Sequence, residues 1–170
     1  MVNEFSDFAR MPKPILRKNN LVELINENIN LLNQLDKSIH INFIKNADEI
    51  ILECDREQLS RVFLNMIKNS IESIHQRSEN GSKFNKKITI ELNQTDSQIS
   101  MIITDNGIGF DNFEKNIKDI LNPYFTTKKN GTGLGLSIVN KIVNDHNGKI
   151  DFLPNKEGAR IKIIFNTNLK

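Results

Sequence analysis

The chain has 170 residues and a mass of 19.5 kDa, enough for one well-buried core, and its 38% hydrophobic and 26% charged residues are typical of a globular protein. No apolar run approaches the roughly 20 residues of a transmembrane helix, and no secretory signal follows Met1, so we expect a cytoplasmic domain. The net charge of +2 is spread along the chain without a basic block, which argues against nucleic acid as a partner.

The chain begins with an arm. Apolar residues between positions 2 and 8 have helical spacing, and Pro12 and Pro14 then stop the helix, because a proline restricts the residue before it. We interpret residues 1–14 as the end of a longer upstream helix with a stiff linker, and residues 15–170 as one domain.

Helical and alternating hydrophobic patterns follow one another along the rest of the chain, and Asn20 and Asp55 are positioned to cap helices. The predicted helices cover residues 21–35, 56 to about 75, 111–118 and 134–144. The predicted strands cover residues 39–44 and 49–53, on either side of a turn at 46–48, and residues 87–92, 98–104, 150–153 and 159–165. This order predicts an α+β fold in which helices cover one face of a sheet.

The single cysteine, Cys54, excludes an intramolecular disulfide and a zinc site built from several cysteines. It follows the apolar residues Ile50, Ile51 and Leu52 at the end of a predicted strand. We therefore expect a buried and unreactive thiol.

Asn65 and Asn69 lie one turn apart on the long predicted helix, so their side chains share a face. Asparagine is unfavourable inside helices, and its amide oxygen is a suitable ligand for Mg²⁺, which takes few protein groups when it bridges phosphates. The pair therefore indicates a magnesium site. Because the chain contains 25 asparagines, a solvated polar face is the alternative.

Asp105 directly follows the predicted strand at 98–104 and begins the sequence Asp-Asn-Gly-Ile-Gly. A carboxylate at a strand end can accept a hydrogen bond from an exocyclic amine, and Gly107 and Gly109 allow the backbone to approach a flat ring closely. An ordinary turn is the alternative, because Asp, Asn and Gly are common in turns.

Gly131, Gly133 and Gly135 lead into a predicted helix in the sequence Gly-Thr-Gly-Leu-Gly-Leu. Glycines at alternate positions expose backbone N–H groups at the positive end of a helix, which favours phosphate binding. The spacing excludes a Rossmann loop, which has a third glycine where Leu136 stands, and a Walker loop, which has Lys-Ser/Thr after its last glycine. A mobile glycine hinge is the alternative.

The polar connector at 122–130 contains an aromatic pair, two hydroxyl groups and two lysines. Lys128 or Lys129 could neutralise a terminal phosphate. Solvated loop lysines are the alternative, and for either lysine taken singly they are the simpler explanation.

In order and spacing, these four elements resemble the N-box, G1-box, F-box and G2-box of the ATP-binding domain of sensor histidine kinases, in the superfamily that includes gyrase B and MutL. The resemblance covers residues 20–165. Its most specific part is Asn-Pro-Tyr-Phe-Thr-Thr-Lys from Asn122, followed closely by Gly-Thr-Gly-Leu-Gly-Leu. Residues 1–14 and 65–73 are similar to the NtrY-type nitrogen-regulation kinases.

The resemblance implies a Bergerat-type ATP-binding fold. This is a two-layer α+β sandwich with a mixed, mostly antiparallel sheet of about five strands, about three helices on one face and a short lid over the ATP. It also implies that residues 1–14 end the second helix of a dimerisation domain, and that residues 15–170 are the catalytic ATP-binding domain.

The resemblance further implies ATP and Mg²⁺ as ligands and gives roles to three polar residues. Asn69 would coordinate Mg²⁺, and Asn65 would contact the phosphates or the metal shell. Lys128 would be the cation of the lid, and we assign catalytic roles to Asn65 and Lys128.

The remaining ligand contacts implied by the resemblance lie in the two glycine-rich motifs and the lid. Asp105 would bind the adenine amine, with Gly107 and Gly109 leaving it room. Tyr124 and Phe125 would anchor the lid or meet a partner helix. The residues expected to bind the phosphates are Gly131, Thr132, Gly133, Leu134, Gly135 and Leu136.

ATP-hydrolysing branches of the superfamily carry a general-base glutamate where this chain has Asn65. An amide cannot take a proton, so we expect transfer of the γ-phosphoryl group to another nucleophile rather than efficient hydrolysis. His40, His75 and His146 lack the flanking residues of the family's phosphoacceptor, so we interpret them as structural or surface histidines.

We therefore expect the catalytic domain of a two-component sensor histidine kinase. It would phosphorylate a histidine of its dimerisation domain, missing here, for relay to an aspartate of a response regulator of the NtrX-like type. The parent would be a homodimer in the bacterial inner membrane and this fragment a monomer. The alternatives are a nucleotide-binding regulatory module or degenerate kinase without phosphotransfer, and an anti-sigma-type serine kinase.

Overall fold

The computed structural model describes residues 11–81, 83–110, 120–124 and 133–167. Its centre is a five-stranded sheet with the strand order β2-β4-β5-β7-β6. β2 and β4 are parallel, and the other neighbouring pairs are antiparallel. The strands are β2 (His40–Lys45), β4 (Lys87–Gln94), β5 (Gln98–Asp105), β6 (Gly148–Phe152) and β7 (Arg160–Asn166).

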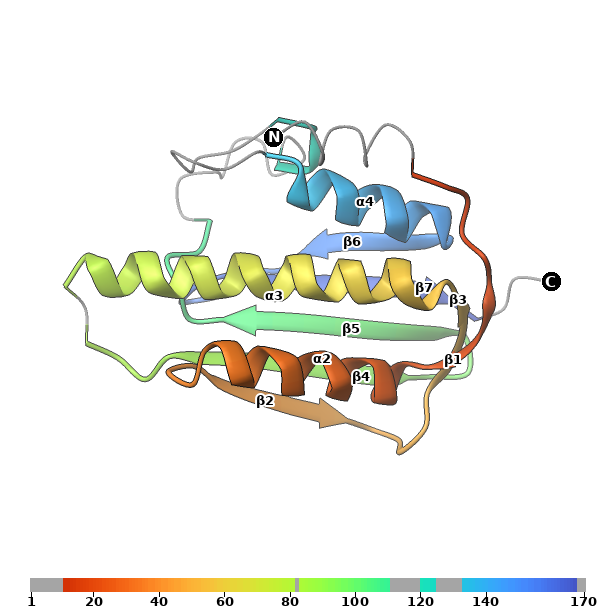
Figure 1. Ribbon diagram of the computed structural model, residues 1–170, viewed down its shortest axis with the longest axis horizontal. Coiled ribbons are helices and arrows are strands. Elements are labelled where there is room, and N and C mark those ends of the chain that lie inside the picture. Colours follow the sequence, from red (N-terminus) through yellow and green to blue (C-terminus); the bar gives the residue numbers. More distant parts are fainter. Residues whose placement is uncertain (1–10, 82, 111–119, 125–132, 168–170) are drawn as a thin grey trace.

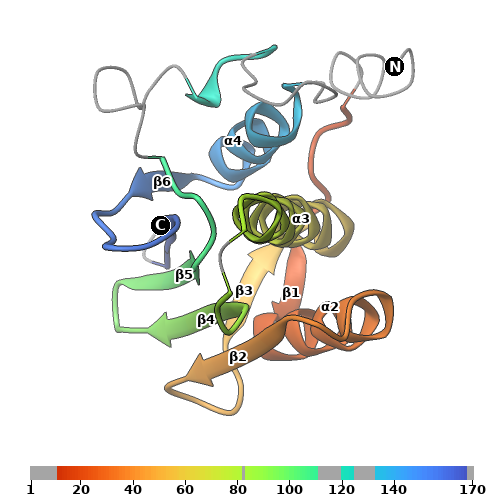
Figure 2. The same ribbon diagram turned by 90° about the vertical axis from the view of Figure 1, so that its left-hand side faces the viewer.

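Three helices of the described chain cover one face of this sheet (Figures 1 and 2), and they are α2 (Leu21–Leu35), α3 (Arg56–Glu79) and α4 (Gly135–Asp145). The long α3 lies between α2 and α4 (Figure 1). This arrangement confirms the predicted α+β sandwich with helices on one face of a mixed, mostly antiparallel sheet.

The core fills the space between the helices and the sheet. Residues at alternate positions of β4 and β5 point into it, because successive side chains of a strand face opposite sides. α3 contributes an apolar stripe to the same cluster. Its most deeply buried members include Val62, Phe63, Met66, Ile67, Ile88, Ile90, Leu92 and Ile99.

A second, two-stranded sheet pairs β1 (Arg17–Asn20) with β3 (Ile51–Cys54). The sequence did not predict β1, because its Arg-Lys-Asn-Asn has no apolar residue to alternate with the polar ones. The strands predicted on either side of the turn at 46–48 exist, but they do not pair with each other. That turn therefore joins two sheets.

Both predicted helix caps are confirmed. The Asn20 side chain accepts a hydrogen bond from the Val22 N–H at 3.1 Å, and the Asp55 carboxylate accepts one from the Gln58 N–H at 3.1 Å. The sequence predicted the bounds of α2 correctly. In contrast, α3 continues about one turn beyond the predicted end, because Arg77 in that turn makes contacts with distant segments.

The segment from Met11 to Leu16 is attached to the beginning of α3. The Gln58 side chain donates to the Pro12 carbonyl at 3.0 Å, and the Ile15 N–H donates to Asp55 Oδ2 at 2.9 Å. Within the described residues, no helix is long and apolar enough to cross a membrane. The helix predicted at 111–118 and the apolar residues between positions 2 and 8 lie outside the described residues.

Cys54 is fully buried at the end of β3, as predicted. Burial raises the pKa of its thiol to about 11. Because the thiolate is the reactive form, this thiol is unreactive at neutral pH.

Candidate functional site

Asp105, the last residue of β5, is a buried carboxylate with only 4% of its surface exposed. Its Oδ1 accepts hydrogen bonds from the Gly107 N–H at 2.9 Å and from the Ala159 N–H at 3.2 Å, and the Ser70 side chain also hydrogen-bonds to the carboxyl group. Burial raises the pKa of Asp105, although these hydrogen bonds oppose the rise. A carboxylate offers about four acceptor positions, so this one can accept a further donor such as an amine.

The loop after Asp105 packs directly on α3. A Cβ at Gly107 would lie 2.6 Å from the backbone carbon of Ser73, so only glycine fits there. The Ile108 N–H donates to Ser73 Oγ at 3.0 Å, which fixes the loop to the helix. Gly107 therefore has a structural role, close packing, that the sequence motif alone did not reveal.

A turn between β6 and β7 closes the other side of Asp105. A Cβ at Gly158 would lie 2.6 Å from the Asp105 side chain, and one at Gly109 would lie 2.7 Å from the Gly158 carbonyl oxygen. Both glycines have positive φ, +69° and +71°, which side chains rarely adopt. We call the group of Asp105, Gly107, Ser73, Gly158 and Ala159 the Asp105 end of the site.

The N-terminus of α4 lies across from Asn69 on α3. Among described atoms, a Cβ at Gly135, the first residue of α4, would meet only the Asn69 side-chain nitrogen, at 3.9 Å. Among the residues that the structure describes, no side chain caps α4, and the first turn of the helix places backbone N–H groups at the positive end of the helix dipole. We call the group of Asn65, Asn69, Gly133 and Gly135 the α4 end of the site.

The segment before α4 is held by close backbone packing. Gly133 has a φ of +68°, and a Cβ there would lie 2.5 Å from the Tyr124 carbonyl carbon. The Tyr124 N–H donates to the Gly133 carbonyl at 3.0 Å, while Tyr124 as a residue is 61% exposed. Leu134 is buried in the core and Leu136 packs against it, so a ligand would meet their backbone rather than their side chains.

Asn65 lies in a groove of about 590 Å³ along the first turns of α3. The other residues that line this groove are Arg56, Glu57, Ser60, Arg61 and Leu64. The groove continues the face of α3 on which Asn65 and Asn69 lie one turn apart, as the sequence predicted.

A model of the family described as histidine kinase-, DNA gyrase B-, and HSP90-like ATPase matches residues 54–169. The chain belongs to this ATPase family. A sensor histidine kinase of Rickettsia conorii, named as NtrY-like, is 37% identical to it over 166 residues, which cover 97% of this chain and 26% of that relative. The chain thus spans about a quarter of the length of the curated relatives it matches.

Solved structures show the same ATPase fold. The catalytic domain of the histidine kinase ThkA, free of nucleotide, is similar with a TM-score of 0.77 and 28% identity, over 89% of this chain and 95% of that one. A crystal structure of ThkA in complex with the response regulator TrrA gives a TM-score of 0.80 over 98% of this chain and 46% of that one. At 24% identity, this second likeness shows the fold alone. The chain is therefore a histidine kinase-type ATPase domain, which implies nucleotide binding.

The donor set of this ATPase domain fits Mg²⁺ at the α4 end. Within residues 11–81, 83–110, 120–124 and 133–167, no cluster of three or more His, Cys, Asp or Glu side chains could hold a metal ion. Mg²⁺ requires less than such a cluster, because it keeps several waters and takes one or two protein oxygens together with phosphates. The amides of Asn65 and Asn69 can supply those oxygens.

The three histidines of the ATPase domain are structural or exposed, as predicted. His40 is exposed on β2, and His75 Nε2 lies 2.8 Å from Asp36 Oδ2. Buried His146 accepts a hydrogen bond from the Asp55 N–H at its Nε2, at 3.0 Å, so its Nδ1 carries a proton and donates to the Ile142 carbonyl at 2.8 Å.

Several predicted contacts of the lid fall on Phe125, Lys128, Gly131 and Thr132, which lie outside the described residues. The sequence did not single out Ser70, Ser73, Gly158 or Ala159 at the Asp105 end. Ser73 is detectable in principle, because it follows Asn69 by four residues on the same helix face. Gly158 and Ala159 are more than 50 residues from Asp105, and only the sheet brings them together.

Proposed function

We propose that this domain binds Mg-ATP between α3 and the N-terminus of α4, with adenine at the Asp105 end and the phosphates at the α4 end. The observation that carries the proposal is the buried Asp105 carboxylate, which is oriented by three hydrogen bonds and can accept one from the adenine amine. Ser73, at the Asp105 end, follows Asn65, at the α4 end, by eight residues on α3. At 1.5 Å per residue the two ends are therefore roughly 12 Å apart along the helix, a length comparable with that of an extended nucleoside triphosphate.

Asn69, assisted by Asn65, is the proposed ligand of Mg²⁺ at the α4 end. The ion would neutralise charge on the phosphates and orient them. Gly131, Gly133 and Gly135, with Thr132 and the backbone of Leu134 and Leu136, would surround the phosphates, and Lys128 would add a positive charge. Backbone N–H groups at a helix N-terminus favour anions, which supports this placement.

We further propose that the γ-phosphoryl group is transferred to a histidine of a dimerisation domain. The bond between the γ-phosphorus and the β–γ bridging oxygen breaks, a P–N bond forms with the imidazole, and ADP leaves. The domain's own contribution is position and charge neutralisation. Asn65 has no basic group to activate water, which supports transfer over hydrolysis.

The partners are proposed on the strength of the relatives. The parent would be a homodimeric sensor kinase of the bacterial inner membrane with this domain in the cytoplasm, and the fragment alone would be a monomer. Residues 1–14 would continue from its dimerisation domain into residues 15–170. The phosphoryl group would pass to an aspartate of an NtrX-like response regulator. The contacts of Pro12 and Ile15 with α3 support a fixed junction at this point.

A chimera tests the proposed reaction. This chain replaces the matching 166 residues of the Rickettsia conorii relative, and the chimera is incubated with Mg²⁺ and γ-labelled ATP, beside the unaltered relative and a chimera with Asp105→Asn. We expect an acid-labile phosphohistidine in the first two samples and little in the third. Nucleotide binding without label would favour a regulatory module or degenerate kinase, and acid-stable phosphoserine would indicate a serine kinase.

A further inference from the structure

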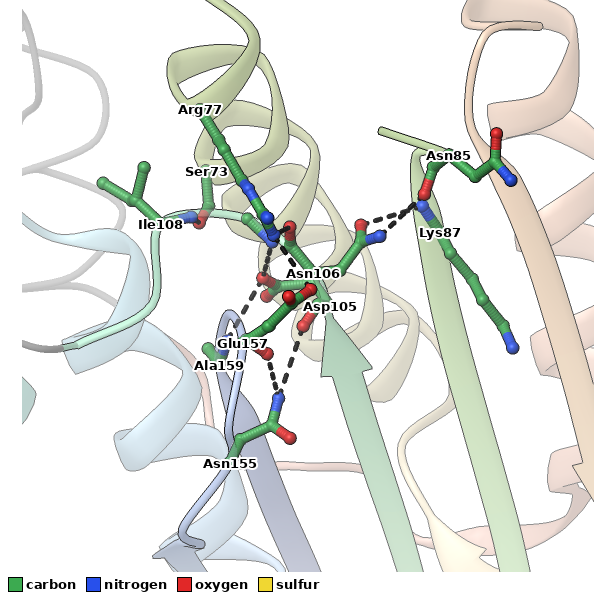
Figure 3. A network of polar contacts seen from close by, with 11 residues as sticks. Ser73, Arg77, Asn85, Lys87, Asp105, Asn106, Ile108, Asn155, Glu157 and Ala159 are labelled. Atoms are coloured by element: carbon green, nitrogen blue, oxygen red, sulfur yellow. Dashed lines mark hydrogen bonds and ion pairs between the residues drawn. The ribbon is translucent and has the colours of Figure 1, made fainter. Parts of the chain in front are cut away.

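Arg77, near the end of α3, connects three segments around the Asp105 end (Figure 3). Its Nη1 donates to the Asn106 carbonyl at 2.7 Å and to Glu157 Oε2 at 3.1 Å. Its guanidinium group also stacks over the Phe84 ring, 4.3 Å from the centroid. One side chain thus links α3 with the residue after Asp105, the β6–β7 turn and the segment before β4.

The β6–β7 turn that Arg77 contacts is also in contact with Asp105. The Asn155 side chain donates to the Asp105 carbonyl at 3.5 Å and to the Glu157 carbonyl, and the Ala159 N–H donates to Asp105 Oδ1 (Figure 3). Asn155 and Glu157 are themselves exposed, so the turn has little core of its own to hold it in place. Its position therefore depends on these polar contacts.

Asn106 fixes the other side of Asp105. Its side chain accepts from the Lys87 N–H at 2.9 Å and donates to the Asn85 carbonyl at 2.7 Å, which ties it to the beginning of β4. Arg77 binds the carbonyl of this same residue. Both chain segments that supply Asp105 and its Ala159 donor therefore meet at Arg77.

We propose that Arg77 is a positioning residue that sets the direction of the Asp105 carboxylate, and with it the preference of the site for a base that carries an amine. This inference rests on the proposed function. Arg77 touches no ligand in this account. It acts through Asn106 on one side and Glu157 on the other, and arginine suits the role because its planar fork can hold two acceptors while it stacks on a ring.

The geometry explains why selectivity, rather than affinity alone, depends on Arg77. A carboxylate aimed at a 6-amino group gains a hydrogen bond, whereas the same carboxylate facing a 6-oxo group meets another acceptor and gains none. If the carboxylate turns away from the base, the hydrogen bond to the amino group weakens, and so does the repulsion between the carboxylate and the oxo group. The two bases then bind more equally.

The experiment compares ATP with inosine triphosphate, which has an oxo group in place of the amine. Dissociation constants for both are measured by calorimetry in the presence of Mg²⁺ for the unaltered chain, Arg77→Ala, Arg77→Lys, Glu157→Ala and the double variant Arg77→Ala/Glu157→Ala. Lys45→Ala is the control, because Lys45 also forms an ion pair, with Asp48 at 2.7 Å, and lies at the end of β2 that is away from the Asp105 end. Thermal unfolding is recorded for every variant.

We expect Arg77→Ala to weaken ATP binding about tenfold, because the hydrogen bond between the adenine amine and a misdirected carboxylate is largely lost. The dissociation constant of inosine triphosphate divided by that of ATP should therefore fall. Arg77→Lys should restore part of the ratio, because lysine keeps the charge but loses the fork and the stacking. Glu157→Ala should reduce the ratio less, and it should add little in the Arg77→Ala background. Lys45→Ala should leave the ratio unchanged.

The inference is overturned if Arg77→Ala weakens the binding of ATP and of inosine triphosphate equally, or if its ratio of dissociation constants matches that of Lys45→Ala. Should Arg77→Ala fail to fold, the same comparison is made with Arg77→Lys and Glu157→Ala, and an unchanged ratio in both overturns it. Absence of ATP binding by the unaltered chain would contradict the proposed function instead, so the two failures are distinguishable.

Discussion

The two ends of the site are built by different means. At the Asp105 end, a buried carboxylate is held by hydrogen bonds from three segments, and glycines are present because neighbouring atoms leave no space for a Cβ. At the α4 end, Gly133 is also closely packed, but the only described atom within 4 Å of a Cβ added at Gly135 is the Asn69 side-chain nitrogen, at 3.9 Å. The polar groups at this end are backbone N–H groups and two amides. Glycine thus serves close packing at both ends, and at Gly135 it leaves room for a ligand.

This difference suits what each end is proposed to bind. A flat base with one amine requires an acceptor in a fixed direction, which rigid packing provides. Phosphates carry many equivalent oxygens, so they require charge and several donors rather than one direction. Substitutions at the Asp105 end should therefore affect folding and base selectivity, and those at the α4 end should affect phosphate and metal binding.

The largest effect is expected for Gly158→Ala. The added Cβ combines a φ of +69° with a separation of 2.6 Å from the Asp105 side chain, so we expect the free energy of unfolding to fall by about 3 kcal/mol. Urea denaturation measures this loss. Gly81→Ala is the control, because Gly81 also has a positive φ, +86°, but no described atom lies within 4 Å of its added Cβ.

The control should lose about 1 kcal/mol, the cost of the backbone conformation alone. Equal losses for Gly158→Ala and Gly81→Ala would show that the Asp105 end is not tightly packed. The contrast between the two ends would then disappear.

Asn69→Ala should weaken ATP binding by roughly 10- to 100-fold in the presence of Mg²⁺, because one metal ligand is lost. With EDTA present, the variant and the unaltered chain should bind ATP alike. Asn69→Asp should keep the dependence on Mg²⁺, since a carboxylate is also a suitable ligand. If Asn69→Ala loses the same amount of ATP affinity with and without EDTA, the metal binds elsewhere. Asn26→Ala, at an exposed position of α2, is the control for removing an asparagine.

Acidification should affect the Asp105 end selectively. Burial raises the pKa of Asp105, so the carboxyl group is neutralised at a higher pH than an ordinary aspartate, whose pKa is about 3.9. ATP binding requires the carboxylate as acceptor, so affinity should fall as the pH falls through this raised pKa. The stability of the free domain should change in the opposite direction, because the folded state favours the neutral form.

The measurement is the ratio of ATP dissociation constants for Asp105→Asn and the unaltered chain across pH. Protonation of the phosphates affects both proteins and cancels in the ratio. We expect the ratio to approach one at low pH. A constant ratio would mean that the charge of Asp105 does not contribute to binding.

The smallest effect is expected for Gly135→Ala. The only described atom that its Cβ would meet is in the Asn69 side chain, at 3.9 Å, so the free energy of unfolding should stay the same or rise by up to about 1 kcal/mol. ATP affinity should fall about threefold, because the methyl group enters the space in front of the α4 N-terminus. Loss of stability with unchanged affinity would reverse the assignment of the two ends.

The sequence predicted the local parts of the fold well. α2 agrees in its bounds because its apolar stripe is regular and Asn20 caps it, and the β4–β5 hairpin is present because its strands alternate and are adjacent in the chain. The pairings of β1 with β3 and β2 with β4 join distant segments, and no local pattern specifies them. Arg77 extended α3 through tertiary contacts, which propensity does not include.

The candidate site also has a local part, which the sequence suggests, and a part that depends on the tertiary fold. Asp105, Asn65 and Asn69 stand out because polar residues interrupt apolar elements. Of the three donors that orient Asp105, Gly107 belongs to a motif that the sequence singled out. The other two were not predictable, because Ala159 contributes a backbone N–H and Ser70 is a small residue on a helix. Their roles arise only when β5, β7 and α3 are brought together.

Calorimetric titration of Mg-ATP into the unaltered chain and into Asp105→Asn tests the central claim most directly, since the two side chains have nearly the same shape. Asparagine replaces a charged acceptor with a weaker one and presents an N–H₂ group of its own. We predict that the unaltered chain binds ATP and that Asp105→Asn, still folded, binds it about 10- to 100-fold more weakly. Equal affinities of the two folded proteins would contradict the assignment of Asp105 to the adenine base.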